Sequence, residues 1–278
     1  MLHYVRATLL TPTGPPDWVD MPLTAHIYEA HKALAEVNGK PAIVYATEPA
    51  ATIYQVRYAY GNIPEPNDAT DWTSTAATGE SVACEHFSPG QLLIDDPYPR
   101  FSYYSSETDQ LYYAQATVDP PATPADWVFT PATEPAHSGN YSALAWWQDK
   151  TVLLHAGPTS DQMHCSRSLV GQPSTLLDWE SHAADNESLD LKRLSVIQLP
   201  DGIGVTYRNG DPPGTVMYAW FEESMPDGPW GWCVVEVAGN VGPDGGQALA
   251  LTADGRPAIA YKSMANDFVW LATMDPPE

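Results

Sequence analysis

Short apolar runs alternate with polar turns along the whole chain. In residues 41–45, PAIVY, the side chains of Ile43 and Tyr45 point one way and those of Ala42 and Val44 point the other, as in a β-strand. Turns rich in Gly, Pro, Asn and Asp separate such runs, as in residues 209–214, NGDPPG. The 27 Pro residues oppose long helices, because each lacks a backbone N–H donor. The pattern predicts an all-β chain of many short strands.

Two markers recur through the chain at nearly one period. The Tyr that ends the PAIVY run reappears at steps of 58, 52, 52 and 54 residues, once as His: Tyr45, Tyr103, His155, Tyr207 and Tyr261. A Trp recurs at a similar step, preceded by Asp in its first four copies: Trp18, Trp72, Trp127, Trp179 and then Trp230 or Trp232. A fixed period of this length is typical of a solenoid, a propeller or an array.

Each repeat holds about four strand-like runs, which is the content of one propeller blade. The sequence therefore predicts a five-bladed β-propeller with four-stranded blades, as a single domain over residues 1–278. The expected units are 27–76, 77–131, 132–183, 184–236, and 237–278 together with 1–26. We expect strands from the N- and C-terminal ends to close the ring, which removes open sheet edges. Runs that resemble the third strand of a blade number six, whereas the runs of every other kind number five. The surplus third strand has no assigned place.

Residues 232–273 resemble the blades of a repeat family of bacterial surface and secreted proteins. The shared pattern, W…SLALD-x-x-G-x-P-x-I-x-Y-Y-D…LKYA, is matched here by Asp254, Gly255, Pro257, Ile259, Tyr261, Leu271 and Ala272. This resemblance implies a propeller architecture and no particular activity. The loop before each Trp is also distantly similar in position to the Asp-box of sialidases, of which the chain retains the Asp-Trp end.

Charge and cysteine content restrict the function further. Acidic residues number 35 against 12 Lys and Arg, for a net charge of −23, which excludes a generic nucleic-acid or anionic-membrane binder. No apolar run approaches the length of a membrane span and no signal peptide is recognisable. We expect no membrane insertion and an intracellular or virion-associated protein. The three cysteines fall in different units and predict buried free thiols rather than a disulfide or zinc site: Cys84, Cys165 and Cys233.

Ligand-binding candidates come from the loops that precede the inner strands, because these loops should open on one face near the axis. The polar and aromatic residues expected there are Glu29, His31, Lys32, His86, His137, Tyr141, Lys192 and Gln247. The histidines do not align between units and show no metal-ligand spacing, so we expect neither a metal nor a cofactor. Repeated Asp and Asn in the turns before the third strands would suit one weak polar site per blade, as in a multivalent lectin.

No catalytic constellation stands out, and no catalytic residue is assigned. The sequence therefore favours a non-catalytic recognition or assembly module that binds glycans or another surface ligand, of which a virion or tail-type component is one form. The first alternative is a glycosidase-like propeller enzyme with axial carboxylates, drawn from Glu29, Glu36, Glu85, Asp95, Asp190 and Asp244. The second alternative is a purely structural subunit of a larger assembly.

Overall fold

A computed structural model describes most of the chain as β-structure. The described residues are 1–9, 11–24, 32–50, 53–79, 98–105, 107–135, 141–157, 162–185, 191–210, 213–222, 224, 226–242, 247–264 and 268–274. Within these ranges the only helical elements are single 3-10 turns, such as Pro124–Asp126. None of the helices in this part of the chain is long and apolar enough to cross a membrane.

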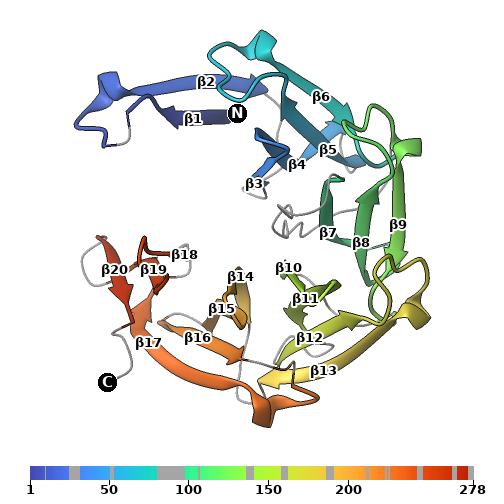
Figure 1. The fold of residues 1–278 in the computed structure, drawn as a ribbon, viewed down its shortest axis with the longest axis vertical. Helices are drawn as coiled ribbons and strands as arrows, with labels where there is room; N and C mark the ends of the chain where they lie inside the picture. Colours follow the sequence, from blue (N-terminus) through green and yellow to red (C-terminus); the bar gives the residue numbers. More distant parts are fainter. Residues whose placement is uncertain are drawn as a thin grey trace.

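The strands form antiparallel sheets arranged around a common centre (Figure 1). The first blade contains β3 (Lys32–Val37), β4 (Lys40–Ala50), β5 (Ile53–Gly61) and β6 (Trp72–Ala76). The second contains β7 (Arg100–Ser105), β8 (Gln110–Ala116) and β9 (Trp127–Pro131). The third contains β10 (Ser142–Trp147), β11 (Lys150–Ala156), β12 (Met163–Ser168) and β13 (Trp179–Asp185). The fourth contains β14 (Lys192–Leu199), β15 (Gly202–Asn209), β16 (Gly214–Glu222) and β17 (Cys233–Val241).

The fifth position is shared by two separate sheets. A C-terminal sheet contains β18 (Gln247–Leu251), β19 (Pro257–Lys262) and β20 (Val269–Thr273), and an N-terminal hairpin contains β1 (Leu2–Ala7) and β2 (Trp18–Thr24). The predicted five-bladed propeller is therefore confirmed. Closure of the ring by the terminal strands is not seen, because among the described residues no backbone pairing joins the hairpin to the C-terminal sheet. In Figure 1 the hairpin lies beside the first blade and the ring is open between β1 and β20.

The third blade shows how the sequence pattern produces a strand pair. β10 and β11 are joined by Gln148 and Asp149, whose φ angles of 48° and 59° fit the two-residue turn preferred by hairpins. This turn places Leu144 opposite Leu153. Both side chains are fully buried, because neighbouring blades cover both faces of the sheet.

The recurring Trp side chains hold adjacent blades together. In three interfaces a third-strand Tyr packs edge-on against the Trp of the next blade, with ring centres at 4.9 Å for Tyr4–Trp72, 5.6 Å for Tyr58–Trp127 and 5.6 Å for Tyr113–Trp179. The fifth copy of the marker is the buried Trp232, whereas Trp230 is 96% exposed. The recurring Trp is therefore explained by packing between blades.

The Asp before each of the first four Trp residues builds the turn that leads into the fourth strand. The Asp126 carboxylate accepts the main-chain N–H groups of Ala122 at 2.9 Å and Thr123 at 2.8 Å. The equivalent carboxylates accept main-chain N–H groups at the same offsets: Asp17, Asp71 and Asp178. The repeated Asp-Trp pair therefore has a structural explanation in every blade that carries it.

Candidate functional site at the starts of the inner strands

The inner strands all start at the same end of the ring, because the strands of every blade run alternately up and down. Lys32 starts β3, Lys192 starts β14 and Gln247 starts β18, while Tyr141 directly precedes β10. Their positions correspond between blades, since each faces the end of a second strand: Lys32 pairs with Tyr45 and Gln247 pairs with Tyr261. These four predicted residues therefore lie at one end of the molecule, on four different blades.

The remaining predicted ligand-binding residues cannot be placed in the same way. Glu29, His31, His86 and His137 lie outside the described residues, as does the side chain of Lys192. Of the candidate axial carboxylates, only Glu36 is described. It pairs with Pro41 beside the turn that joins β3 to β4, and so lies at the opposite end of the ring.

Marker side chains at the ends of the second strands form hydrogen bonds within this face. Tyr45 shares a 2.7 Å hydrogen bond with the Ser74 hydroxyl. His155, the marker of the third blade, is fully buried, with Nε2 2.7 Å from the Ser166 hydroxyl. The repeated marker position thus places a polar side chain at the same height in several blades, although it is a Tyr in some blades and a His in another.

A buried carboxylate occurs at the fourth marker. The Tyr207 hydroxyl donates a 2.5 Å hydrogen bond to Asp185, the last residue of β13 in the preceding blade. Asp185 is 6% exposed and is the only acidic side chain buried among the residues that the structure describes. Sequence reasoning missed it, although the Tyr207 marker was visible. In the sequence Asp185 directly precedes the segment of residues 186–190, which contains Asp190.

Short polar contacts also join strands of successive blades. The Ser102 and Ser142 hydroxyls lie 2.9 Å apart between the second and third blades. The side-chain amide of Gln247 donates to the Arg193 carbonyl between the fourth and fifth. Part of the polar character expected of Gln247 as a ligand-binding residue is therefore used within the fold.

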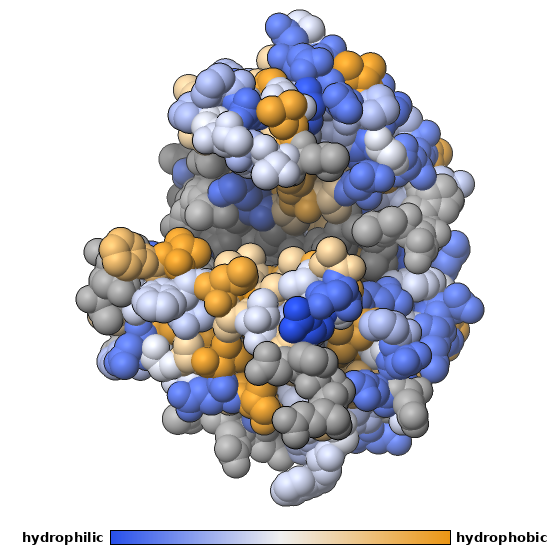
Figure 2. All heavy atoms as spheres, turned by 60° about the vertical axis from the view of Figure 1, so that its left-hand side comes forward, coloured by the Kyte–Doolittle hydropathy of each residue, from blue (hydrophilic) through white to orange (hydrophobic). Residues whose placement is uncertain are grey.

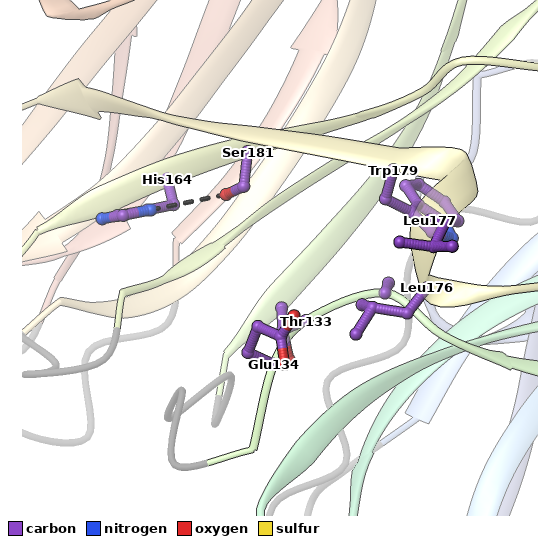
Figure 3. A pocket seen from close by; sticks show the side chains of 8 residues that line it. Thr133, Glu134, His164, Leu176, Leu177, Trp179 and Ser181 are labelled. Atoms are coloured by element: carbon purple, nitrogen blue, oxygen red, sulfur yellow. Dashed lines mark hydrogen bonds between the residues drawn. The ribbon is translucent and has the colours of Figure 1, made fainter.

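A separate pocket of about 330 Å³ opens between the second and third blades (Figure 3). Glu134, His164 and Ser181 contribute its polar lining, and Ser181 Oγ lies 3.5 Å from Nδ1 of His164. Leu177 and Trp179 lie on the opposite side. The pocket contains one carboxylate, whereas glycoside hydrolysis generally uses two, so it does not supply a hydrolytic site from its described lining alone. Among the described residues, no three His, Cys, Asp or Glu side chains converge to hold a metal ion.

Comparison with known proteins supports the fold class and corrects the expected function. No protein-family model matches the chain, and no curated protein matches it. Its fold is similar to that of an endo-arabinase from Bacteroides thetaiotaomicron, with a TM-score of 0.55, 10% identity, and coverage of 93% of this chain and 98% of that one. For an α-L-arabinofuranosidase from Lactobacillus brevis the TM-score is 0.54, the identity 10%, and the coverage 89% and 92%.

A third similar structure is CoXyl43, a GH43 β-xylosidase/α-arabinofuranosidase from a compost microbial metagenome, with a TM-score of 0.50, 14% identity, and coverage of 91% and 93%. At these identities the likeness concerns the five-bladed propeller fold. The prediction of a non-catalytic recognition or assembly module is contradicted by this comparison, since the propellers that share the fold are glycosidases. The repeat-blade resemblance correctly indicated a propeller, and no family model confirms the repeat family itself.

Proposed function

We propose that the chain is a glycosidase-like propeller enzyme that acts on a glycan containing arabinose or xylose. The observation that carries the proposal is the common starting end of the inner strands, since the sequence segments directly before them contain most of the candidate carboxylates. The likeness in fold to arabinose- and xylose-releasing enzymes over about nine-tenths of the chain supports the choice of substrate class.

The candidate carboxylates can be reduced by position. Glu36 lies at the far end of β3 and is removed from the set. Five carboxylates remain outside the described residues. Glu29, Glu85, Asp190 and Asp244 stand in the segments that precede the inner strands, and Asp95 directly follows the run expected to form the inner strand of the second blade. Two of them would act as acid and as base or nucleophile, and their separation would set whether the sugar configuration is retained or inverted.

Other residues of this face suit the binding of a sugar. Lys32 is exposed at the start of β3, and Tyr141 is half-buried before β10. An ammonium group and a phenol can both hydrogen-bond sugar hydroxyls. The buried Asp185–Tyr207 pair is assigned as a positioning element, because Asp185 directly precedes the segment that contains Asp190 in the sequence.

The test is hydrolysis of four substrates: aryl α-L-arabinofuranosides, aryl β-D-xylosides, arabinan and xylan. Hydrolysis is measured as the released phenol for the aryl glycosides and as new reducing ends for the polysaccharides. Each of the five carboxylates is replaced by its amide. The matched control is Glu36→Gln, which removes a carboxylate at the far end of the inner strand β3. We expect two amide variants to lose activity by roughly 10²–10⁴-fold, which is the range of general acid–base catalysis. Glu36→Gln should retain wild-type activity.

Absence of hydrolysis on all four substrates would refute the proposed substrate class. Equal activity of all five amide variants, with hydrolysis by the wild type, would refute the assignment of the site. Tyr207→Phe provides a separate test of the positioning role. We expect this variant to have a lower kcat on the substrate that the wild type hydrolyses, whereas the kcat of Glu36→Gln stays unchanged.

A further inference from the structure

The interfaces between blades follow one rule. Each blade has a Trp face, which carries the marker Trp and packs on the preceding blade. The opposite face, called the Tyr face here, packs on the following blade and carries a third-strand Tyr, replaced by Cys165 in the third blade. In the first blade Ile43, Ala59 and Trp72 form the Trp face and meet Tyr4 of the hairpin. In the second blade the equivalent residues Phe101, Ala114 and Trp127 meet Tyr58.

The N-terminal hairpin uses only one of these faces. Its Tyr face, with Leu2, Tyr4 and Met21, is buried against the first blade. Its Trp face is open, and Val5 and Trp18 are 49% and 46% exposed. Trp18 is thus the one marker Trp in a largely exposed position, although its turn and register match those of Trp72.

The C-terminal sheet uses only the opposite face. Its Trp face, with Leu249 and Ile259, is buried against Val216 and Tyr218 of the fourth blade. Its other face is open, and Leu271 of β20 is 68% exposed. Figure 2, which brings the open side of the ring forward, shows apolar side chains gathered over the part of the surface formed by the C-terminal strands. The hairpin and the C-terminal sheet each supply the face that the other leaves uncovered.

An apolar cavity of about 240 Å³ lies where the missing Trp of the fifth blade belongs. Its lining includes Tyr218 from the Tyr face of the fourth blade, and Ile259 and Ala272 from the C-terminal sheet. By strand register these are the counterparts of Tyr58, Phe101 and Ala114, which surround Trp127. The cavity therefore has the lining of a marker Trp site without its Trp.

β1 and β20 are equivalent third strands. Ala7 pairs with Trp18 as Gly61 pairs with Trp72, so Val5 is the counterpart of Ala59. Ala59 pairs with Ile43, and in the C-terminal sheet Ala272 takes the same partner position opposite Ile259. Val5 and Ala272 are therefore alternative antiparallel partners of Ile259, and only one strand can occupy that place.

We propose that the hairpin completes the fifth blade of its own chain, with β1 replacing β20 beside β19 and Trp18 filling the cavity at Tyr218. Burial of Trp18 and Val5 drives the closure, because both are apolar side chains exposed in the open ring. Four interfaces of the same molecule supply the pattern that this fifth interface completes. The displaced β20 accounts for the surplus third strand of the sequence.

Cysteine trapping tests this pairing directly. Val5→Cys and Ile259→Cys are combined in a Cys84→Ser, Cys233→Ser background, because directly paired antiparallel residues lie within disulfide reach. We expect an intramolecular disulfide in the monomer, seen by mass and by non-reducing electrophoresis. The matched control combines Val5→Cys with Leu177→Cys, an exposed residue of the third blade, and should not cross-link. Failure of the first pair to cross-link, or its cross-linking only into dimers, would overturn the proposal.

A second measurement uses the Trp itself. Trp18→Ala should lower the thermal midpoint by about 5 °C or more, as removal of a buried Trp does. Trp230→Ala, at a nearly fully exposed Trp, should leave it unchanged. An equal, negligible effect of both substitutions would show that Trp18 stays in solvent and would contradict closure. Neither measurement depends on enzymatic activity.

Discussion

Asp126 is exposed, yet it is held by hydrogen bonds from the main-chain N–H groups of Ala122 and Thr123, which keep the pKa of its carboxyl below the ordinary value. The pKa values of Asp17 and Asp178 are lowered for the same reason. A pKa lower in the folded than in the unfolded chain stabilises the fold above the unfolded value of about 3.9, and this contribution is lost as the pH falls through the folded value.

We therefore expect Asp126→Asn to flatten the loss of stability below about pH 4, since an amide keeps an acceptor oxygen but does not titrate. Thermal midpoints measured from neutral pH to about pH 3 check this. Asp201→Asn, which removes an exposed charge at another turn, is the control. If the thermal midpoint of Asp126→Asn falls below pH 4 as steeply as that of the wild type, protonation of Asp126 does not contribute to acid unfolding.

The thiols of Cys165 and Cys233 should differ sharply in reactivity. Cys165 is buried in β12, and burial raises the pKa of its thiol to about 12, whereas Cys233 is exposed at the start of β17. The expectation of buried thiols is thus confirmed for Cys165 and wrong for Cys233, while Cys84 lies outside the described residues. In a Cys84→Ser background, a thiol reagent should label one cysteine in the native protein and a second only after denaturation. Rapid labelling of both in the native protein would contradict the packing of β12.

At the scale of strands, the contact between the third strand of one blade and the fourth strand of the next carries much of the stability. Trp127 is 5% exposed and touches Tyr58 and Phe101. Trp127→Ala should lower the free energy of unfolding by about 3–5 kcal/mol. Trp230→Ala should stay within about 0.5 kcal/mol, because Trp230 contributes no buried surface. Chemical denaturation of the two variants against the wild type provides the comparison.

The strands were predictable because burial makes them short apolar runs between polar turns. Ala42, Ile43, Val44 and Tyr45 are all buried, so this strand is covered on both faces. The marker Trp recurs because successive interfaces between blades repeat the same packing. Ring closure was expected from the same repetition, but a repeat pattern does not say whether β1 or β20 pairs with β19. Cys233 was misjudged because β17 is exposed at four consecutive residues from Cys233 to Glu236, and so on both faces, which composition alone does not reveal.

The site was less predictable than the strands for a related reason. Loops follow no period, so sequence reasoning placed Lys32, Tyr141 and Gln247 near the starts of the inner strands but could not rank them. The sequence alone did not show that Glu36 lies at the far end of its strand. Asp185 was missed because its burial depends on Tyr207 of another blade, a contact that only the folded ring creates.

At the scale of the whole molecule, a net charge of −23 should oppose compaction through self-repulsion. Salt screens this repulsion, because the Debye length falls from about 30 Å at 0.01 M salt to about 8 Å at 0.15 M. The thermal midpoint should therefore rise when sodium chloride is increased over that range. A midpoint that falls with salt would indicate that attractive ion pairs, such as Arg167 with Glu180, outweigh the repulsion.

The division of the fifth position between two sheets has a consequence for how the molecule comes apart. A blade contacts only its neighbours, so an open ring behaves like a linear array with two frayed ends. Amide protons of β11, such as those of Leu153 and Leu154, would then exchange most slowly, and protection would decline towards β1 and β20. Once the hairpin is seated, no blade is terminal, and exchange should become nearly even around the circle.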